Sequence, residues 1–409
     1  MPAVSSSKPK VIASLLWFLL TLAVVIGTSL WLRMVWSTPA EELPDTSSLA
    51  FGPQMTVGQV VKQVQPLLPG EPELAPKLVG KSLQVNPQES AQRTLAELGI
   101  EPTEAAAAIG RTLALKAERE SKDFKRIFLK FGLWIILLIV PLVILARGGL
   151  TPRLRLVMLG SAVAIFGIIL GSDPSPMGTV KDAVTLFGIH RAVFAPRIIA
   201  LGVFLLLVVI ANKFICSWGC QFGTLQEFIH RLNRPGKTGR SALPVIKLPF
   251  VLTNTVRILT FAALTLAAFI WAFDLIGLID PFKVFKPAHL GWVGGAFLVI
   301  ILVAALFTYR PWCNLFCPFG LVSWLFERLS FWKIRVDYGR CTACRACTKA
   351  CPSQAMEGIL TGKALPADCF SCGDCLPACP TSAVQFTRPG VIRPSEERGE
   401  ILKKLSSEN

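Results

Sequence analysis

The chain is poor in the side chains that hold haem and in charged residues. Its 409 residues include only three histidines, His190, His230 and His289, and none of them lies in the middle of an apolar run. A histidine pair for haem b is therefore lacking, no C-x-x-C-H motif exists for haem c, and no G-x-G-x-x-G follows a predicted strand. Charged residues make up 17% of the chain, whereas soluble proteins contain about a quarter. These absences argue against a soluble protein and against haem or dinucleotide chemistry.

Hydrophobic residues are abundant instead, at 52%, and they gather in long runs. A helix needs about 17–25 apolar residues to cross a bilayer. Six runs of about this length, the third of them short, are predicted as transmembrane helices: 11–32, 127–146, 156–171, 195–214, 255–279 and 291–309. The first run is too long for a signal-peptide core, so residues 1–36 are interpreted as an uncleaved signal-anchor helix.

The net charge of +16 predicts the orientation of these helices. Basic residues cluster in three segments that fall on one side if six spans alternate: Lys8 and Lys10; Arg147, Arg153 and Arg155; Arg231, Arg234, Lys237, Arg240 and Lys247. The positive-inside rule then places both termini in the cytoplasm of a bacterium, with a multi-pass protein in its inner membrane. Because the basic residues are dispersed beside helix ends, we expect no nucleic-acid partner.

The segment 37–125 is then exterior and is predicted as a small helical domain. Thr56-x-x-Gln59 is a capping-box pattern, and Asn86-Pro87 indicates a second helix start. Prolines between residues 66 and 76 favour an irregular connection, and a third helix is expected from about Pro102 into the second span. The segment has no cysteine or histidine, so docking of a partner and a simple spacer both remain open.

Eight of the twelve cysteines form two copies of one pattern, C-x2-C-x2-C-x3-C-P. This is the ligand run of a two-cluster bacterial ferredoxin, in which the fourth cysteine of each run serves the other cluster. One [4Fe-4S] cluster is predicted to take Cys341, Cys344, Cys347 and Cys379, and the other Cys369, Cys372, Cys375 and Cys351. Structural zinc would instead use well-separated cysteine pairs. Residues 331–388 are therefore predicted as a small α+β ferredoxin-like domain, followed by a charged tail at 389–409.

The other four cysteines form two C-x3-C pairs, Cys216/Cys220 and Cys313/Cys317, in the predicted five-helix membrane domain 126–330. The surrounding sequences align, and they suggest a duplicated two-helix unit. Spacing of i, i+4 would place both thiols of a pair on one helical face. Four thiolates are enough for a third iron–sulfur or metal centre, with [4Fe-4S], [2Fe-2S] and copper all open. Simple packing of small thiols is the alternative.

Four polar residues lie near the predicted exterior helix ends: His190, Arg197, Asp274 and Asp280. Charged groups in a membrane are costly and often functional. Each of these four residues could instead form an ion pair with a structural role alone, or extend its side chain to the membrane–water interface.

The paired C-x3-C motifs joined to a two-cluster ferredoxin segment resemble those of the membrane polyferredoxins over about residues 127–385. This group includes the quinol-dehydrogenase subunit of periplasmic nitrate reduction (NapH type), the nitrous-oxide-reduction regulator (NosR type) and an oxidase-assembly protein (CcoG type). The NapH type fits best, although Cys220-Gln221 replaces the usual Cys-Pro and the segment 37–125 is unusually long.

The resemblance implies an α-helical membrane protein that acts as an iron–sulfur electron-transfer subunit of an oxidoreductase. Such a subunit relays electrons between the quinone pool and other redox subunits. With no haem in this chain, a quinone would have to bind near the C-x3-C cysteines, or a partner would have to hold a further cofactor. The alternative is an assembly or regulatory protein that reduces or transfers a metal such as copper, because thiolates also suit Cu(I).

Overall fold

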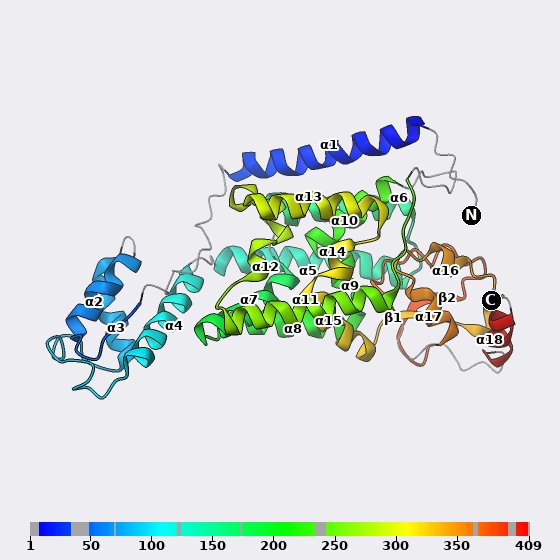
Figure 1. Cartoon of the computed structure of the whole chain (residues 1–409). Coiled ribbons are helices and arrows are strands. Elements are labelled where there is room, and N and C mark those ends of the chain that lie inside the picture. Colours follow the sequence, from blue (N-terminus) through cyan, green and yellow to red (C-terminus); the bar gives the residue numbers. More distant parts are fainter. Residues whose placement is uncertain are drawn as a thin grey trace.

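The computed structural model describes residues 8–33, 49–68, 71–120, 124–171, 174–233, 243–362, 367–391 and 398–407. These residues form three parts along one axis (Figure 1): a small helical domain, a helical bundle and a small α+β domain. The small domain and the α+β domain lie at opposite ends of the bundle. Three basic residues named above lie outside the described ranges, namely Arg234, Lys237 and Arg240.

The bundle is built from long apolar helices and several short ones. The long elements are α1 (Lys8–Arg33), α5 (Phe124–Ala146), α6 (Pro152–Ala162) continued by the π-helix η4 (Val163–Ile169), α7 (Pro176–His190), α8 (Ala195–Ala211), α10 (Gln221–Leu232), α11 (Phe250–Ile270) and α13 (Trp292–Phe307). The short ones are α9 (Phe214–Trp218), α12 (Leu275–Leu278), η5 (Pro281–Phe285), η6 (Pro287–His289), α14 (Pro311–Leu315), α15 (Pro318–Phe326) and η7 (Glu327–Leu329).

Within the described residues, four helical segments are long and apolar enough to cross a membrane: Val11–Trp31, Ile127–Ala146, Pro152–Ile169 and Phe250–Ile270. The other two predicted spans correspond to α8 and α13, which are apolar but shorter. α8 ends where Asn212 adopts a positive φ angle of 60°, and α13 ends where the backbone of Thr308 becomes extended. An apolar stretch does not by itself fix where a helix ends.

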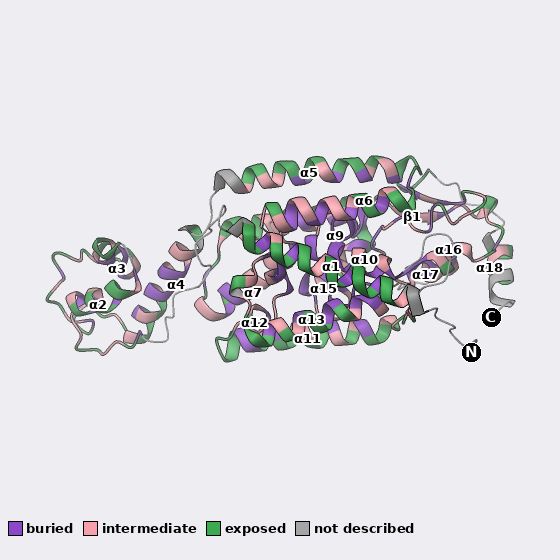
Figure 2. Ribbon diagram, turned by 90° about the horizontal axis from the view of Figure 1, so that it is seen from above, coloured by how far each residue is buried: buried purple, intermediate pink, exposed green. Residues whose placement is uncertain are grey.

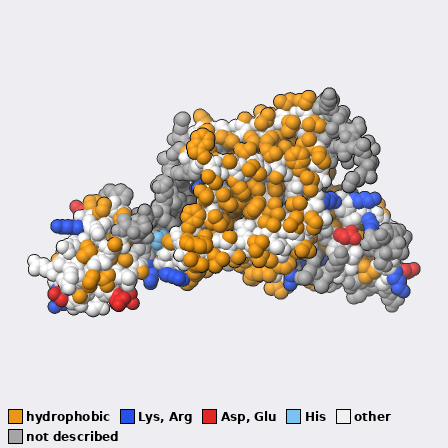
Figure 3. Space-filling view, in the orientation of Figure 1, with side chains coloured by type: hydrophobic (Ala, Val, Ile, Leu, Met, Phe, Trp, Pro, Cys, Tyr) orange, Lys and Arg blue, Asp and Glu red, His pale blue; other side chains and the backbone are white. Residues whose placement is uncertain are grey.

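The surface of the bundle is apolar. Hydrophobic side chains cover the face shown in Figure 3, and charged ones gather at its two ends. Trp17, Ile136 and Leu259 on three different helices are 58%, 62% and 63% exposed. Inside, buried residues concentrate where the helices meet (Figure 2). Apolar area of this extent would be unfavourable in water and fits contact with lipid.

The small domain contains α2 (Val57–Val64), the 3-10 turns η2 (Gln65–Leu67) and η3 (Pro72–Leu74), α3 (Ala75–Leu83) and α4 (Pro102–Glu120). The predicted capping box is present, since the Thr56 and Gln59 side chains each accept a hydrogen bond from the other's backbone N–H.

Two expectations for this domain were wrong. The segment around Pro76 is the first turn of α3 rather than an irregular connection, and a proline there suits a helix start. The helix expected from Asn86 is a series of turns, because the Asn86 side chain accepts a hydrogen bond from the Gln88 N–H. α4 begins at Pro102 as predicted, but its junction with α5 lies outside the described residues.

The α+β domain contains β1 (Lys333–Val336), η8 (Tyr338–Arg340), α16 (Ala346–Ala350), α17 (Ala355–Thr361) and β2 (Val384–Thr387), and α18 (Arg398–Ser407) follows it. β1 and β2 pair in antiparallel fashion, with Lys333 opposite Thr387. The pairing joins the two ends of the segment predicted as ferredoxin-like and leaves the cysteine runs in the loops and short helices between them.

Candidate functional site

Each C-x3-C pair lies at a break between two helices. Cys216 lies in α9, whereas Cys220 has extended backbone angles and precedes α10. Cys313 in α14 and Cys317 before α15 repeat this arrangement. The expectation that both thiols of a pair share one face of a continuous helix was therefore wrong. The break turns the chain back on itself and makes a hairpin.

The first hairpin reaches into the bundle. The Trp134 indole, in the middle of α5, donates a hydrogen bond of 2.9 Å to the carbonyl oxygen of Gly219. The Gln221 side chain donates one of 2.9 Å to the carbonyl oxygen of Pro174. Backbone that leaves the helical pattern is tolerated within a membrane domain when protein surrounds it and satisfies its polar groups.

The two hairpins have the same local geometry. A Cβ atom on Gly223 would lie 2.8 Å from the carbonyl oxygen of Cys216, and one on Gly320 would lie 2.8 Å from that of Cys313. Any larger residue at either position would push the second helix of its hairpin away from its cysteine. This close approach explains why the two aligned sequences share glycine here.

The four thiols of the hairpins come together. Electrostatic interactions link the Cys216 thiol to those of Cys220, Cys313 and Cys317. Three of the four residues are buried, and Cys220 is partly buried. Within the described ranges, no three cysteine, histidine or acidic side chains are grouped as ligands of a single metal ion. A [4Fe-4S] cluster takes one thiolate at each of four separate irons, so its ligands lie further apart than those of one ion.

A buried ion cluster lies beside the first hairpin. Glu227 in α10 accepts hydrogen bonds from Arg155, Arg310 and the Tyr309 hydroxyl at 2.6–3.1 Å. Arg310 also donates to the carbonyl oxygen of Cys216 at 2.6 Å. Arg155, Glu227 and Arg310 are completely buried. The backbone of the first cysteine is thus held by a guanidinium group.

A second buried ion cluster lies beside the second hairpin. Asp368 pairs with Lys213 and, at 2.6 Å, with Arg257. Both cations also donate to the carbonyl oxygen of Gly320, at 3.0 and 2.8 Å. Burial raises the pKa of the neighbouring Glu327 to about 8, and its carboxyl group lies 3.6 Å from the Lys213 ammonium group.

Positive charge exceeds negative charge in this region. Among the described residues of these two ion clusters, four fully buried cations face the carboxylates of Glu227 and Asp368. Uncompensated cations in a low-dielectric interior are costly. A cluster held by four thiolates carries negative charge and would balance them, so the surrounding residues fit an iron–sulfur centre.

The loop Asp368–Asp374 of the α+β domain contacts the bundle at these hairpins. Trp218 donates its indole hydrogen to the carbonyl oxygen of Ser371 at 3.1 Å. Arg231 holds both carboxylate oxygens of Asp374, at 2.7 and 2.8 Å. Phe370 packs edge-on against Tyr309, with ring centroids 5.9 Å apart. Since this loop contains Cys369 and Cys372, we call the group Cys351, Cys369, Cys372 and Cys375 the proximal set.

The structure brings the eight ferredoxin-type cysteines together in the crossed arrangement. Cys341, Cys344, Cys347 and Cys379 line one cavity and are called the distal set. Cys351 interacts electrostatically with Cys369, Cys372 and Cys375. The fourth cysteine of each run therefore lies with the first three of the other, while their assignment as ligands of two clusters stays a prediction.

The two runs also share their backbone path. Positive φ angles occur at three pairs of aligned positions: Ala343 and Ser371, Arg345 and Gly373, Gln354 and Ser382. Non-glycine residues rarely adopt this conformation. Its recurrence at matching positions indicates one loop geometry used twice.

Burial differs between the two sets. Burial raises the pKa of the Cys369 thiol to about 12 and moves those of Cys372 and Cys375 well above the usual value. In the distal set Cys344 is exposed. Burial also acts on the Cys379 thiol, but hydrogen bonds from the Val384 and Ala383 backbone and from Thr381 lower its pKa. Metal binding requires thiolates, so bound iron would replace the protons that the proximal thiols otherwise keep.

Sequence reasoning missed most of the buried charges. Lys213 and Arg310 each precede the first cysteine of a C-x3-C pair by three residues, and Asp368 directly precedes Cys369. This recurring position in the repeat was a usable signal. Arg155 was interpreted only as a loop residue marking the cytoplasmic side, yet it is completely buried.

Three of the four polar residues predicted near the other end of the bundle come together. Lys181 lies 3.5 Å from Asp274, 3.8 Å from Asp280 and 3.6 Å from Asp182. Arg197 pairs with Asp182 at 2.8 Å. We call these five residues the Lys181 network; His190 lies at the end of α7.

Comparison with known proteins gives matches to iron–sulfur families. Residues 340–384 match the 4Fe-4S dicluster domain. A second family, the 4Fe-4S binding domain, matches twice, at 193–239 and 290–336, and each match contains one hairpin. No solved structure matches the chain.

Two known proteins are similar to parts of this chain. YccM of Escherichia coli K12, assigned provisionally to electron transport, is 27% identical over 40% of this chain and 48% of its own length. The regulatory protein NosR of Pseudomonas aeruginosa is 30% identical over 34% of this chain and 20% of its own length. The chain thus spans about half of the first relative and a fifth of the second. It is a mostly helical protein with 4Fe-4S domains, related to YccM and NosR.

Proposed function

We propose that this protein is a membrane-bound iron–sulfur subunit that relays electrons between the quinone pool and a redox partner, as the NapH-type quinol dehydrogenases do. The apolar bundle, the matches to 4Fe-4S families and the relation to an electron-transport protein support this function. The proposed location is a bacterial inner membrane, with the α+β domain and both termini cytoplasmic and residues 37–125 exterior.

The twelve cysteines hold three centres in this proposal. The distal and proximal sets each bind one [4Fe-4S] cluster, and the four hairpin thiols bind a third iron–sulfur centre. These groups supply one-electron transfer when bound. The chain contributes the thiolates, keeps water away from the inner sites and fixes the orientation of each loop.

One observation carries the order of the relay. The proximal loop lies against the hairpins through Trp218, Arg231 and the Lys213–Asp368 pair, whereas Cys344 of the distal set reaches the surface. Electrons would therefore pass from the hairpin centre to the proximal cluster and then to the distal cluster. The distal cluster would exchange them with a cytoplasmic partner or with another subunit.

The test compares iron and acid-labile sulfide per chain in the purified wild type and in a Cys216→Ser/Cys220→Ser double variant. We expect a loss of one cluster's iron, because two remaining thiols cannot hold a centre that needs four. Low-temperature EPR should still detect the proximal and distal clusters after reduction with dithionite. Reduction of these clusters by a quinol should stop, because their entry point is gone.

The control is Asn314→Ser, which changes a residue between Cys313 and Cys317 whose side chain donates a hydrogen bond to the Tyr309 carbonyl oxygen. It should keep all the iron. Unchanged iron and unchanged quinol reduction in the double variant would show that the hairpin thiols only pack. Copper in place of iron in the wild type would favour an assembly role instead.

A further inference from the structure

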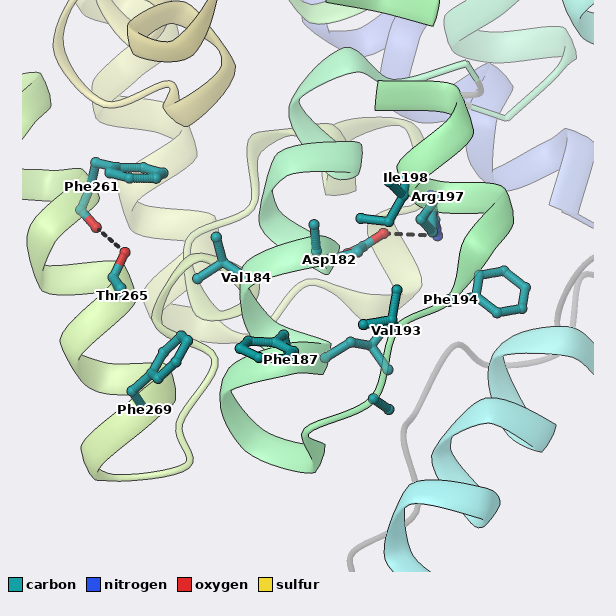
Figure 4. Close-up of a pocket in the computed structure, with 13 residues that line it drawn as sticks. Asp182, Val184, Phe187, Val193, Phe194, Arg197, Ile198, Phe261, Thr265 and Phe269 are labelled. Atoms are coloured by element: carbon teal, nitrogen blue, oxygen red, sulfur yellow. Dashed lines mark hydrogen bonds and ion pairs between the residues drawn. The ribbon is translucent and has the colours of Figure 1, made fainter. Parts of the chain in front are cut away.

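A cavity of about 350 Å³ opens in the bundle between α7, α8 and α11. Figure 4 shows its walls, with Phe187, Phe261 and Phe269 on one side and Asp182 and Arg197 together at the other. A volume of this size is at the lower end of the range for small-molecule sites. The cavity thus combines aromatic walls with a single charged pair.

The mouth of the cavity faces the apolar surface of the bundle. Phe187 and Phe269 are 43% and 38% exposed, and Val193 and Ile198 are also exposed. If the bundle lies in a bilayer, this mouth opens to lipid. The rim nearer the small domain is covered by α4, whose Ala114 packs with Leu186 and Ala192. The small domain therefore helps to separate the cavity from water.

The charged end of the cavity belongs to the Lys181 network. Arg197 donates to a carboxylate oxygen of Asp182 at 2.8 Å, and Lys181 links Asp182 with Asp274 and Asp280. A guanidinium group can donate a hydrogen bond to a carbonyl oxygen, and a carboxylate can accept one from a hydroxyl group. The remaining carboxylates offer a route by which protons can leave.

The same end of the cavity lies close to the first hairpin. α7 begins at Pro176, directly after the segment whose Pro174 carbonyl is bonded to Gln221, the neighbour of Cys220. Asp182 lies six residues along this helix, a rise of about 9 Å. From the Asp280 side, Phe282 packs against Phe222 with ring centroids 5.8 Å apart. Two segments of the Lys181 network thus contact the hairpin that carries Cys220.

We propose that this cavity binds the ring of a lipid-soluble quinone, with a ring oxygen at Arg197 and Asp182 and the isoprenoid tail leaving past Phe187 and Phe269. The proposal rests on the proposed function and gives its quinone a site in the half of the bundle nearer the small domain. Oxidation of the quinol releases two electrons and two protons. An iron–sulfur centre held by Cys216, Cys220, Cys313 and Cys317 would accept the electrons one at a time when bound, and the protons would pass through Asp182 to the Lys181 network.

This location differs from both sequence-based alternatives, which were a quinone near the C-x3-C cysteines or a partner that holds a further cofactor. A phospholipid acyl chain could also fill an apolar cavity. It would not use the charged pair, and this difference makes the two occupants separable.

Photolabelling of the full-length protein in phosphatidylcholine nanodiscs tests the site. The probe is an azido-ubiquinone, with decylubiquinone as competitor, and labelled peptides are identified by mass spectrometry. We expect labelling on α7, α8 or α11 that decylubiquinone suppresses. Val184→Trp fills the cavity and should reduce the labelling at least about tenfold. Arg197→Gln removes the hydrogen-bond donor and should reduce the labelling to a similar extent, because a hydrogen bond to a charged group is lost.

Two matched variants serve as controls. Val203→Trp places the same ring on the exposed surface of α8, and Arg147→Gln removes a charge at the other end of the bundle. Both should label like the wild type, and EPR of the dithionite-reduced clusters should be unchanged in all four variants.

Each other outcome has a distinct meaning. Labelling at the hairpin cysteines would overturn the proposed quinone site, and so would labelling of the cavity that Val184→Trp and Arg197→Gln do not reduce. If a quinol still reduces the clusters in that case, the proposed function survives. Labelling that phospholipid blocks and decylubiquinone does not block identifies a lipid site. If the purified protein contained no iron but the cavity was still specifically labelled, the quinone site would be supported and the proposed electron relay would be overturned.

Discussion

The proximal and distal cysteine sets have the same ligand pattern and the same positive-φ positions, yet their surroundings differ. The proximal loop lies against the bundle, where Asp368, Ser371 and Asp374 each meet a partner from the hairpin region. The distal loop contains an exposed cysteine, Cys344. One loop geometry thus provides an inward-facing site and an outward-facing one, and the contacts around each loop make the difference.

The largest expected effect comes from breaking the crossed ligand sets. Cys351→Ser should remove or convert the proximal cluster, and Cys379→Ser the distal one, although each lies in the sequence run of the other cluster. Iron analysis and EPR would measure the loss of each cluster, and Cys351→Ser should leave the EPR signal of the distal cluster intact. If Cys379→Ser instead abolished the signal of the proximal cluster, the crossed assignment of ligands would be wrong.

A smaller effect is expected from the contact that fixes the proximal loop. Burial opposes ionisation of Asp368, but Lys213 and Arg257 lower its pKa, so the pairing is present at neutral pH and is lost only as the pH falls through this lowered pKa. Asp368→Asn would remove the carboxylate that pairs with two buried cations. It should cost about 3–5 kcal/mol, measured as a lower Tm in detergent together with easier proteolytic release of the α+β domain.

The matched change in the distal half is Asp337→Asn. The Asp337 side chain caps η8 by accepting a hydrogen bond from the Gly339 N–H at 3.2 Å. Asn and Asp cap helices about equally well, so this variant should lose almost no stability. Equal losses in the two variants would mean that docking of the proximal loop depends on other contacts.

The smallest expected effect concerns Gly373, which has φ of +83° and touches the bundle. A Cβ there would lie 2.6 Å from the side chains of Leu145 and Leu150. Gly373→Ala should cost about 1–2 kcal/mol from backbone strain and about 1–3 kcal/mol more from overpacking. Thermal unfolding in detergent would measure the sum.

Gly390→Ala isolates the strain, because Gly390 has φ of +84° and nothing near its Cβ position. Gly390→Ala should show only the cost of backbone strain, about 1–2 kcal/mol. If both glycine variants lose the same stability, the proximal loop yields to the added methyl group and its docking is looser than these contacts imply.

Local pattern predicted several elements because their causes are local. The Thr56–Gln59 capping box, the start of α4 at Pro102 and the crossed cysteine sets all follow from residues a few positions apart or from a repeated spacing. The helix at Asn86 was predicted wrongly because its side chain forms a turn with its own backbone instead. The single face for Cys216 and Cys220 failed because the chain bends between them.

Residue types and their spacing alone show which residues are available as ligands and where apolar segments begin. They also show that both cysteine motifs are repeated. These features depend on residue type and spacing, which any fold of the chain preserves. Folding of the whole chain was needed to establish which loop faces the bundle, and that Arg155, Lys213, Arg257 and Arg310 are buried beside the cysteines. Those outcomes depend on contacts between segments far apart in the sequence, such as Lys213 with Asp368, whose energies exist only after the chain has folded.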